Sequence, residues 1–369
     1  MSDLAGRTGI VGVAAVSALG RGSQAQLAGV LSGTAAFGPV RRFDVGGRRV
    51  KDAATLAGVG PLGDELAWVI RDACADAGLT RAQRATTPLM LAVHGHPDAA
   101  RLSTTDKPTA AGLAAELAGR AGLAGAAKVY TCACVSASTA VADAAALVRA
   151  GRVERVVVAA GYLVEPDQFA LFDAGRALAT DGAARPFSAG RTGLLLGDAV
   201  SAVVLEAVGT REVLAEVVGW GRAGDAYHAV RPDPAGNGLA RAITAAVRRA
   251  GIDPARIGYV NANAGGAEGD AAEAAALRQA LGAARIPVSS TKSVHGHALE
   301  GSGLLELIVT VLATMAGKLP VNTGYLGPDP ACELDVILDA PRPAGSPYAL
   351  SLNAAFGGAN TALLVKAVS

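Results

Sequence analysis

The sequence predicts an α/β protein, and three observations support this fold class. Short apolar runs alternate with alanine-rich amphipathic stretches along the chain, which is the pattern of helices laid over sheets. Apolar residues make up 51% of the 369 residues, enough for a sizeable core. The order of strands and helices is similar in two halves that meet near residue 208. We therefore expect an internal duplication, with one unit at residues 1–207 and a second at residues 208–369.

The individual elements follow from these patterns. The first half predicts strands at residues 9–20, 89–95, 155–161 and 201–207. A run of helix formers before Gly151 predicts a helix at residues 142–151, with this glycine as its C-cap. The second half predicts strands at residues 213–221, 257–263, 286–293, 335–340 and 348–368, and helices at residues 237–251, 269–282 and 301–317.

Composition excludes several classes of partner and location. The formal net charge is +1 and no basic run stands out, so we do not expect a nucleic-acid partner. The apolar run near the N-terminus is short and broken by glycine, unlike a signal peptide, which favours a cytoplasmic protein. The apolar helix at residues 301–317 is too short for a membrane span and is expected in the core.

The cysteines indicate thiol chemistry rather than disulfides or a metal site. No CxxC pair and no histidine at zinc spacing accompany them; they are Cys74, Cys132, Cys134 and Cys332. Cys134 directly precedes a predicted helix, whose unpaired N–H groups and positive dipole end favour the thiolate. The alternative for Cys134 is a small buried apolar residue. Cys132 is expected on the incoming strand, as a packing residue.

Five segments, in order, resemble the β-ketoacyl synthases of the thiolase fold, in particular the type that elongates acyl chains on acyl carrier proteins. They lie at residues 9–44, 134–161, 171–207, 289–306 ("SSTKSVHGHALEGSGLLE") and 353–360 ("NAAFGGAN"). The resemblance implies a thiolase-like five-layered αβαβα fold of two duplicated halves, usually dimeric. It also implies an acyl carrier protein as partner and no cofactor, since the substrate arrives on phosphopantetheine.

The resemblance assigns roles to four residues. Cys134 matches the cysteine that accepts the acyl group. Lys292 followed five residues later by His297 reproduces the step between the family's lysine and its second histidine. We expect His297 to polarise the substrate carbonyl or to assist the thiol; the alternative is a core histidine. Glu306 matches a glutamate in the lysine's polar network, either catalytic or as an ion pair that fixes the loop.

The chain departs from the family at its first histidine. The family motif reads roughly Val-Asn-Ala-His-Gly-Thr-Ser-Thr, whereas this chain has "VNANAGGAEGD", with Asn263 in the histidine's place and one residue fewer. An amide still donates a hydrogen bond but does not exchange a proton near neutrality. We therefore expect one oxyanion contact to survive at Asn263 and acid–base function there to be lost.

Further departures concern the acyl pocket. The closing loop has Ala354 and Ala355 where the family has its gating aromatic residue, which predicts a cavity beside the nucleophile for a bulkier substrate. Backbone N–H groups near Phe356 are expected to help hold the oxyanion, and Phe172 is a further candidate for the substrate site. His295 is an added histidine, either a substitute general base or a solvent-facing loop residue. Residues 95–128 form a shorter region than is usual in the family, where this part of the chain contributes to the dimer and the pocket lid.

These features predict a ketosynthase-like enzyme of specialised, polyketide-like metabolism. We expect it to load an acyl group onto Cys134 and to carry out acyl transfer, condensation or cyclisation without malonyl decarboxylation. One alternative is a conventional 3-oxoacyl-carrier-protein synthase that uses Asn263 as the enolate donor. Another is a non-catalytic partner subunit of a ketosynthase, akin to a chain length factor. A homodimer is expected, with a heterodimer with another ketosynthase left open.

Overall fold

The computed structural model describes residues 6–96, 108–209, 211–282 and 285–368. Its principal strands are β1 (Thr8–Ser17), β5 (Pro88–Ala92), β6 (Gly125–Tyr130), β7 (Arg155–Tyr162), β8 (Ala199–Ala207), β9 (Ala215–Gly224), β10 (Ile257–Asn261), β11 (Pro287–Ser289), β15 (Tyr348–Ala355) and β16 (Ala359–Ala367). Shorter strands are β2 (Gly20–Arg21), β3 (Gly38–Pro39), β4 (Asp52–Ala53), β12 (Lys318–Leu319), β13 (Asp335–Val336) and β14 (Arg342–Pro343).

The α-helices are α1 (Ser23–Ser32), α2 (Leu62–Asp76), α3 (Arg81–Ala85), α4 (Ala110–Ala121), α5 (Ser136–Arg149), α6 (Pro166–Ala174), α7 (Asn237–Ala250), α8 (Gly269–Leu281), α9 (Lys292–His295) and α10 (Ser302–Met315). Single turns of 3-10 helix are η1 (Ala133–Val135), η2 (Pro254–Arg256), η3 (Leu299–Gly301) and η4 (Pro330–Cys332).

The same strand order occurs in both halves of the chain. The first half runs β1-β8-β7-β5-β6 across the sheet, and the second runs β9-β16-β15-β10-β11, with β13 beyond it. Strands of equal rank along the chain occupy equal places, and β1 and β9 pair where the halves meet. The two halves thus repeat one topology, and position 208 falls in the connection between β8 and β9.

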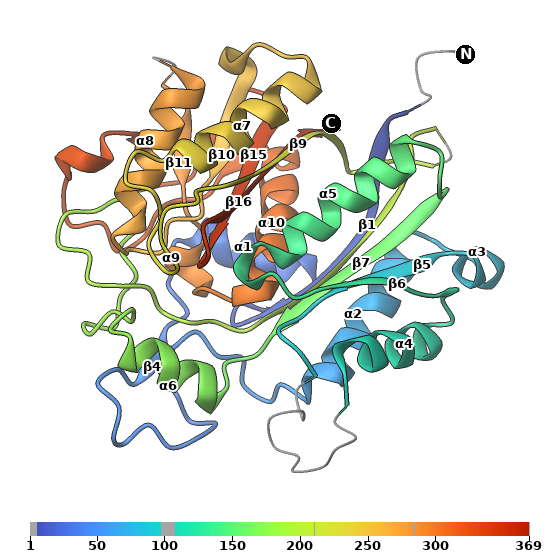
Figure 1. Ribbon diagram of the computed structural model, residues 1–369, viewed down its shortest axis with the longest axis horizontal. Helices are drawn as coiled ribbons and strands as arrows, with labels where there is room; N and C mark the ends of the chain where they lie inside the picture. The colour runs from blue at the N-terminus through green and yellow to red at the C-terminus, as the bar shows by residue number, and fades with distance from the viewer. Residues whose placement is uncertain (1–5, 97–107, 210, 283–284, 369) are drawn as a thin grey trace.

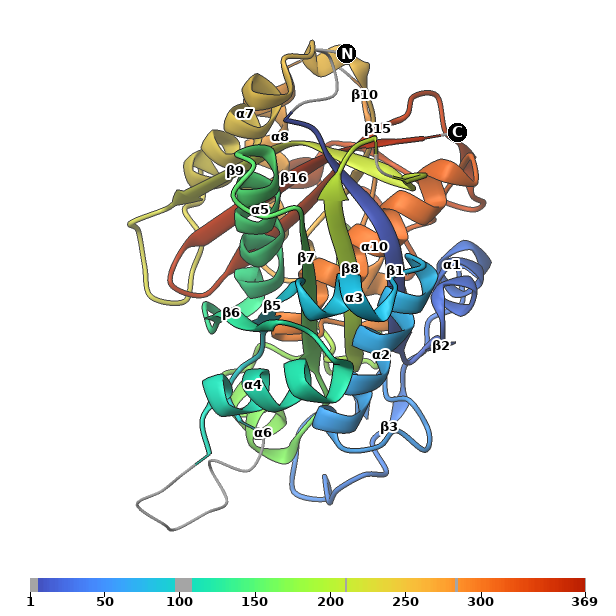
Figure 2. The same ribbon diagram turned by 90° about the vertical axis from the view of Figure 1, so that its right-hand side faces the viewer.

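Helices α5 and α10 form the central layer of the molecule. Both pack against strands of the two halves, α5 on β7 and β16, and α10 on β15 and β8. On the outer faces, α2 and α4 cover the first half and α7 covers the second, with α8 beside it. Figures 1 and 2 show these two outer pairs at opposite sides of the molecule. The five layers predicted from the resemblance are confirmed.

Three apolar clusters fill the spaces between the layers. The largest lies around α5 and α10 and draws side chains from both halves. A second cluster joins α2 and α4 to the first half of the sheet, and a third joins α7 and α8 to the second half. The apolar helix predicted at residues 301–317 is α10, and it lies in the core as expected.

Several predicted strands end earlier than expected, and one of these differences moves a site residue. The single strand predicted at residues 348–368 is a hairpin of β15 and β16, because the chain turns back at Gly357 and Gly358. The strand predicted at residues 286–293 ends at Ser289, because a helical turn follows in which the Ser293 N–H donates to the Ser290 carbonyl. Lys292 therefore lies on α9 rather than on a strand. The strand predicted at residues 335–340 is only β13. Gly151 has the left-handed φ of 66° expected at a helix end, one residue after the C-cap Ala150.

Close approach of α7 to β9 depends on a glycine at position 221. A Cβ added to Gly221 would lie 1.8 Å from the backbone oxygen of Ala242 on α7. Gly221→Ala is therefore expected to lower the free energy of unfolding by about 2–3 kcal/mol, because the helix must move outward. Urea unfolding measures this loss. Gly224→Ala on the same strand is the control, since its Cβ meets nothing within 4 Å; equal losses in both variants would contradict the packing argument.

Candidate active site

Cys134 lies in a tight turn between strand and helix. Strand β6 ends at Tyr130, the turn η1 follows, and α5 begins at Ser136. Ala133 has a left-handed φ of 53°, and the Ser136 hydroxyl donates to the Ala133 carbonyl (2.7 Å), which closes the turn. The Cys134 side chain is half-buried and packs against the central apolar cluster. The structure thus places Cys134 at the start of a central helix, as predicted.

The predicted thiolate is not the favoured form of Cys134. Burial, together with the charge of Glu300, raises the pKa of this thiol to about 12. The Lys292 charge and the backbone N–H of Cys134 itself act in the opposite direction. The helix start does favour the thiolate, but removal of water from the sulfur is the larger effect. Cys134 therefore rests as a thiol and requires a proton acceptor when it reacts.

Cys132 does not have the packing role that was expected. Its side chain is exposed, because β6 ends two residues earlier and the chain has already left the sheet. It is consequently an accessible neighbour of the buried candidate nucleophile.

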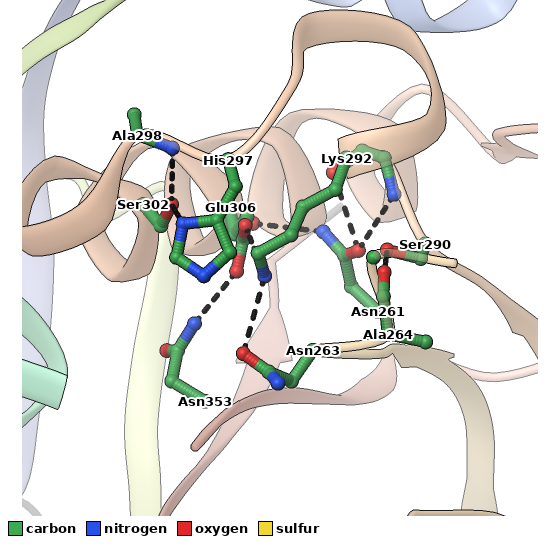
Figure 3. A network of polar contacts seen from close by, with 12 residues as sticks. Asn261, Asn263, Ala264, Ser290, Lys292, His297, Ala298, Ser302, Glu306 and Asn353 are labelled. Atoms are coloured by element: carbon green, nitrogen blue, oxygen red, sulfur yellow. Dashed lines mark hydrogen bonds and ion pairs between the residues drawn. The ribbon is translucent and has the colours of Figure 1, made fainter. Parts of the chain in front are cut away.

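Lys292 and Glu306, two members of the predicted polar network, form a buried ion pair. The Lys292 Nζ lies 2.6 Å from Glu306 Oε1, and the two side chains are 1% and 0% exposed. The Asn353 amide donates to Glu306 Oε2 (2.7 Å), so both carboxylate oxygens have a partner. Figure 3 shows these side chains converging from α9, α10 and β15. Burial raises the pKa of Glu306, and the lysine and the amide oppose this rise.

Asn263 is a second hydrogen-bond acceptor for the Lys292 ammonium group. Its Oδ1 accepts a hydrogen bond from Lys292 Nζ at 3.4 Å (Figure 3). An ammonium group only donates, so the amide oxygen must face Lys292 and the NH2 group must face the other way. Asn263 is half-buried and so keeps a donor on its far side. This geometry agrees with the expected donor role and gives the amide no part in proton exchange.

Two carboxylates that the sequence analysis missed hold the Asn263 loop. Glu273 on α8 accepts from the Asn263 backbone N–H (2.8 Å). Asp270 accepts backbone N–H groups of the same loop, at residues 265–267, and that of Phe187. Burial raises the pKa of Asp270 to about 6 and that of Glu273 to about 8. The signal in the sequence was the pair of acidic residues three apart at the start of a predicted helix.

His297 is fixed as a hydrogen-bond donor. Its Nδ1 accepts from the Leu299 backbone N–H (3.0 Å) and lies 3.3 Å from the Ser302 hydroxyl, which itself accepts from the Ala298 N–H (Figure 3). The ring proton therefore resides on Nε2. Burial and the Lys292 charge hold the pKa of His297 well below its ordinary value, so the ring is neutral. Of the two expected roles, this geometry favours polarising a carbonyl over accepting a proton.

His295 lies in neither of the two expected environments. It is fully buried, its Nδ1 lies 2.8 Å from the Gly296 carbonyl and its Nε2 lies 3.0 Å from the Thr291 hydroxyl. The carbonyl only accepts, so Nδ1 donates and Nε2 accepts from threonine. Burial and the Lys292 charge lower the pKa of His295 to about 3. With both nitrogens occupied, His295 is a packing residue of α9 and not a substitute general base.

The closing loop between β15 and β16 carries one aromatic residue, Phe356. Ala355 is half-buried, and Phe356 follows it with 50% of its surface exposed. The Phe356 ring stacks on Phe172 of α6, with ring centroids 5.8 Å apart and 17° between the planes. The two predicted pocket residues are therefore in contact. Whether the two alanines widen the acyl pocket stays a prediction.

Part of the region expected to form a lid, residues 97–107, lies outside the described residues. In the described ranges, no helix is long and apolar enough to cross a membrane. Among the same residues, no cluster of three or more His, Cys, Asp or Glu side chains is placed to hold a metal ion.

Five layers, a cysteine at a strand-to-helix turn, and a Lys-Glu-His-Asn network define the class of thiolase-fold condensing proteins. The chain belongs to the beta-ketoacyl synthase family: the family's N-terminal domain model matches residues 69–210 and its C-terminal domain model matches residues 214–325. The comparisons therefore confirm the family resemblance.

Individual relatives agree with this assignment. The 3-oxoacyl-[acyl-carrier-protein] synthase 2 of Staphylococcus aureus is 33% identical over 247 residues, which are 63% of this chain and 61% of that protein. A Synechocystis protein of the same name is 35% identical over 63% of this chain and 60% of its own length. The matched part of the chain therefore spans less than two thirds of either relative.

Solved structures extend the likeness over the whole chain. A beta-ketoacyl synthase from Burkholderia phymatum has a TM-score of 0.90 at 26% identity, covering 98% of this chain and 100% of that one. The ishigamide ketosynthase/chain length factor has a TM-score of 0.92 at 25% identity, covering 98% and 99%. The thiolase-like fold is thus shared from end to end.

The lowered pKa values of the two buried histidines predict their contribution to the pH dependence of the free energy of unfolding. In the folded state the pKa values of His295 and His297 lie below the unfolded value of about 6.5. As the pH falls below 6.5, the unfolded chain binds these protons and the folded chain does not. The free energy of unfolding should therefore fall by about 1.4 kcal/mol per pH unit for each histidine. Asp270 and Glu273, whose pKa values are raised, contribute with the opposite sign, so the test is the difference between wild type and variant. His297→Gln should remove the share of one histidine, about 1 kcal/mol between pH 7.0 and 5.5, measured by urea unfolding at both pH values. An unchanged pH dependence would contradict a neutral His297.

Proposed function

We propose that this protein takes an acyl group from a carrier-protein thioester onto Cys134 and transfers it without decarboxylating a malonyl thioester. The observation that supports this function best is the state of Asn263. Its oxygen faces Lys292, so the position offers an amide donor and no exchangeable proton. Bond formation is then to an oxygen or nitrogen nucleophile, or between two parts of the bound chain. The reaction belongs to specialised metabolism and takes place in the cytoplasm.

The geometry supports a separate role for each residue in the first half-reaction, the transfer of the acyl group to Cys134. The Cys134 sulfur attacks the thioester carbonyl, and the resulting oxyanion needs donors. Neutral His297 offers Nε2–H and Asn263 offers its amide NH2. Lys292 and Glu306 orient the network without exchanging protons, because each is neutralised by the other. No cofactor is needed, since the substrate arrives on the phosphopantetheine arm of the carrier.

A conventional elongating synthase is the second candidate, favoured by the name of the relatives at 33% and 35% identity. In that reaction Asn263 would hold the enolate oxygen of the decarboxylated malonyl group with its NH2. A non-catalytic partner subunit is the third candidate, favoured by the likeness of the fold to the ishigamide ketosynthase/chain length factor. The complete network around Cys134 argues against this third candidate.

Intact-protein mass spectrometry with acyl-carrier-protein thioesters tests the proposal. Wild type should gain the mass of the acyl group, Cys134→Ala should not, and Cys132→Ala should still gain it, because this exposed neighbour takes no part. Addition of malonyl-carrier protein should release no carbon dioxide. Release of carbon dioxide together with a product two carbons longer would establish the conventional synthase instead. Absence of acylation across a broad thioester panel would favour the partner subunit.

The edge strand β6 supports a dimer. In the described sheet it is terminal, and its central residues Ala126, Ala127 and Lys128 are exposed. Pairing of this edge with its copy would cover the unpaired backbone groups. Light scattering should therefore give twice the 36.5 kDa mass of the chain, and Val129→Pro should shift the protein toward monomer. A wild-type monomer would contradict the homodimer and favour a heterodimer with another ketosynthase.

A further inference from the structure

Among the described residues, the Lys292, Glu306 and His297 side chains offer no acceptor for the Cys134 proton. His297 Nδ1 already accepts from Leu299, so its Nε2 carries the ring proton. Lys292 is a charged donor held by Glu306, and Glu306 is held in turn by Asn353. Because the pKa of Cys134 is raised to about 12, acylation at neutral pH needs a base to take this proton.

Glu300 is a buried carboxylate at the same site. It lies in η3, the turn before α10, and η3 packs against both η1, which carries Cys134, and the strand β7. The residue is 2% exposed, its Oε1 lies 3.1 Å from His94 Nδ1, and its Oε2 has no hydrogen-bond partner among the described residues. A buried carboxylate oxygen without a donor is costly, so its presence in a turn that packs against the turn with Cys134 calls for a functional explanation.

The surroundings of Glu300 show why its free oxygen matters for the thiol. Among the charged groups near Cys134, Glu300 has the largest effect on the thiol pKa, ahead of Lys292 and Glu306. The other titratable groups that face the pair are Tyr162 at the end of β7 and Glu165 beside His94. Burial keeps the pKa of Tyr162 well above its ordinary value, so Tyr162 stays a neutral phenol.

His94 holds the carboxylate in place from the solvent side. It follows the end of β5 by two residues, and its side chain is 66% exposed. The carboxylate has no proton to give, so a neutral His94 must donate from Nδ1 to Oε1. This bond occupies one oxygen of Glu300 and leaves the other buried without a partner among the described residues. His94 is thus a positioning residue, and its pKa is raised, mainly by the same hydrogen bond.

We propose that Glu300 is the general base of this site, accepting the Cys134 proton on its free oxygen while His94 fixes the carboxylate. In the first half-reaction the S–H bond of Cys134 breaks and an O–H bond forms on Glu300. The sulfur forms a bond to the acyl carbon, and the bond from that carbon to the phosphopantetheine sulfur breaks. The departing thiolate then takes the proton from Glu300, so the carboxylate is regenerated. This inference rests on the proposed acylation of Cys134.

Alkylation of Cys134 by iodoacetamide tests the base without any acyl substrate, in a Cys132→Ala background that removes the exposed thiol. At pH 7, Glu300→Gln should slow the reaction roughly tenfold or more, and its rate should rise about tenfold per pH unit, because the thiolate then forms only by loss to solvent. The alkylation rate of the protein with Glu300 intact should depend less on pH. If Glu300 acts only through its charge, its removal lowers the thiol pKa and the variant reacts faster, which would overturn the proposal.

Two further variants separate a base from a structural role. His94→Ala should slow alkylation and His94→Asn should restore most of the rate, because the asparagine NH2 can replace the Nδ1–H donor; this exposed position leaves the fold intact. Glu333→Gln, at an exposed position far along the chain, is the control for the loss of a carboxylate. If His94→Ala and wild type react alike, His94 has no positioning role. Slow alkylation of Glu300→Gln with no acylation of wild type would retain the base and reject the proposed function.

Discussion

The ion pair between Lys292 and Glu306 is the constraint on which the site depends. Two charges that are almost completely removed from water each lose several kcal/mol of solvation, a loss that only close and complete pairing can offset. The partners of this pair come from α9, α10, β15 and the loop after β10. The network therefore fixes these four elements relative to one another. It also helps to keep the neighbouring histidines neutral, because burial and then the Lys292 charge lower the pKa of both His295 and His297.

One consequence is that the site is rich in donors and poor in acceptors. A neutral His297 with Nδ1 occupied offers only Nε2–H, and Asn263 with its oxygen on Lys292 offers only NH2. Such a set stabilises a developing oxyanion without reorganisation. It does nothing for the thiol proton, which burial makes hard to remove. The thiol proton thus needs an acceptor outside the ion pair, and Glu300 is buried with one oxygen that has no partner among the described residues.

Hydrophobic patterns predicted the order of the elements, and the resemblance to the β-ketoacyl synthases supplied the members of the network, matched by their spacing. Lys292, His297 and Glu306 come together since a fixed step along α9, η3 and α10 places them so. Spacing said nothing about burial. Cys132 is exposed because β6 ends at Tyr130, and both nitrogens of His295 are occupied by its own turn, at Gly296 and Thr291. The raised pKa of Cys134 results from burial and from charges that distant segments carry. Glu300 was missed for the same reason, since its partner His94 is 206 residues away along the chain.

The duplicated fold explains why groups so distant in sequence meet. β6 and β11 occupy equal places in the two halves, so the turn with Cys134 and the segment with Lys292 and His297 leave equivalent strand ends. The central helices that follow, α5 and α10, begin against each other through η1 and η3. β5 and β10 are likewise equivalent, and His94 and Asn263 each follow their strand by two residues. The second half, with Asn263 after β10, is thus matched by a first half with the imidazole of His94 at the equivalent position after β5. Glu300 belongs to the second half, and its carboxylate binds this imidazole of the first half. The duplicated fold therefore brings together a carboxylate and an imidazole from different halves, and this pair can provide acid–base function.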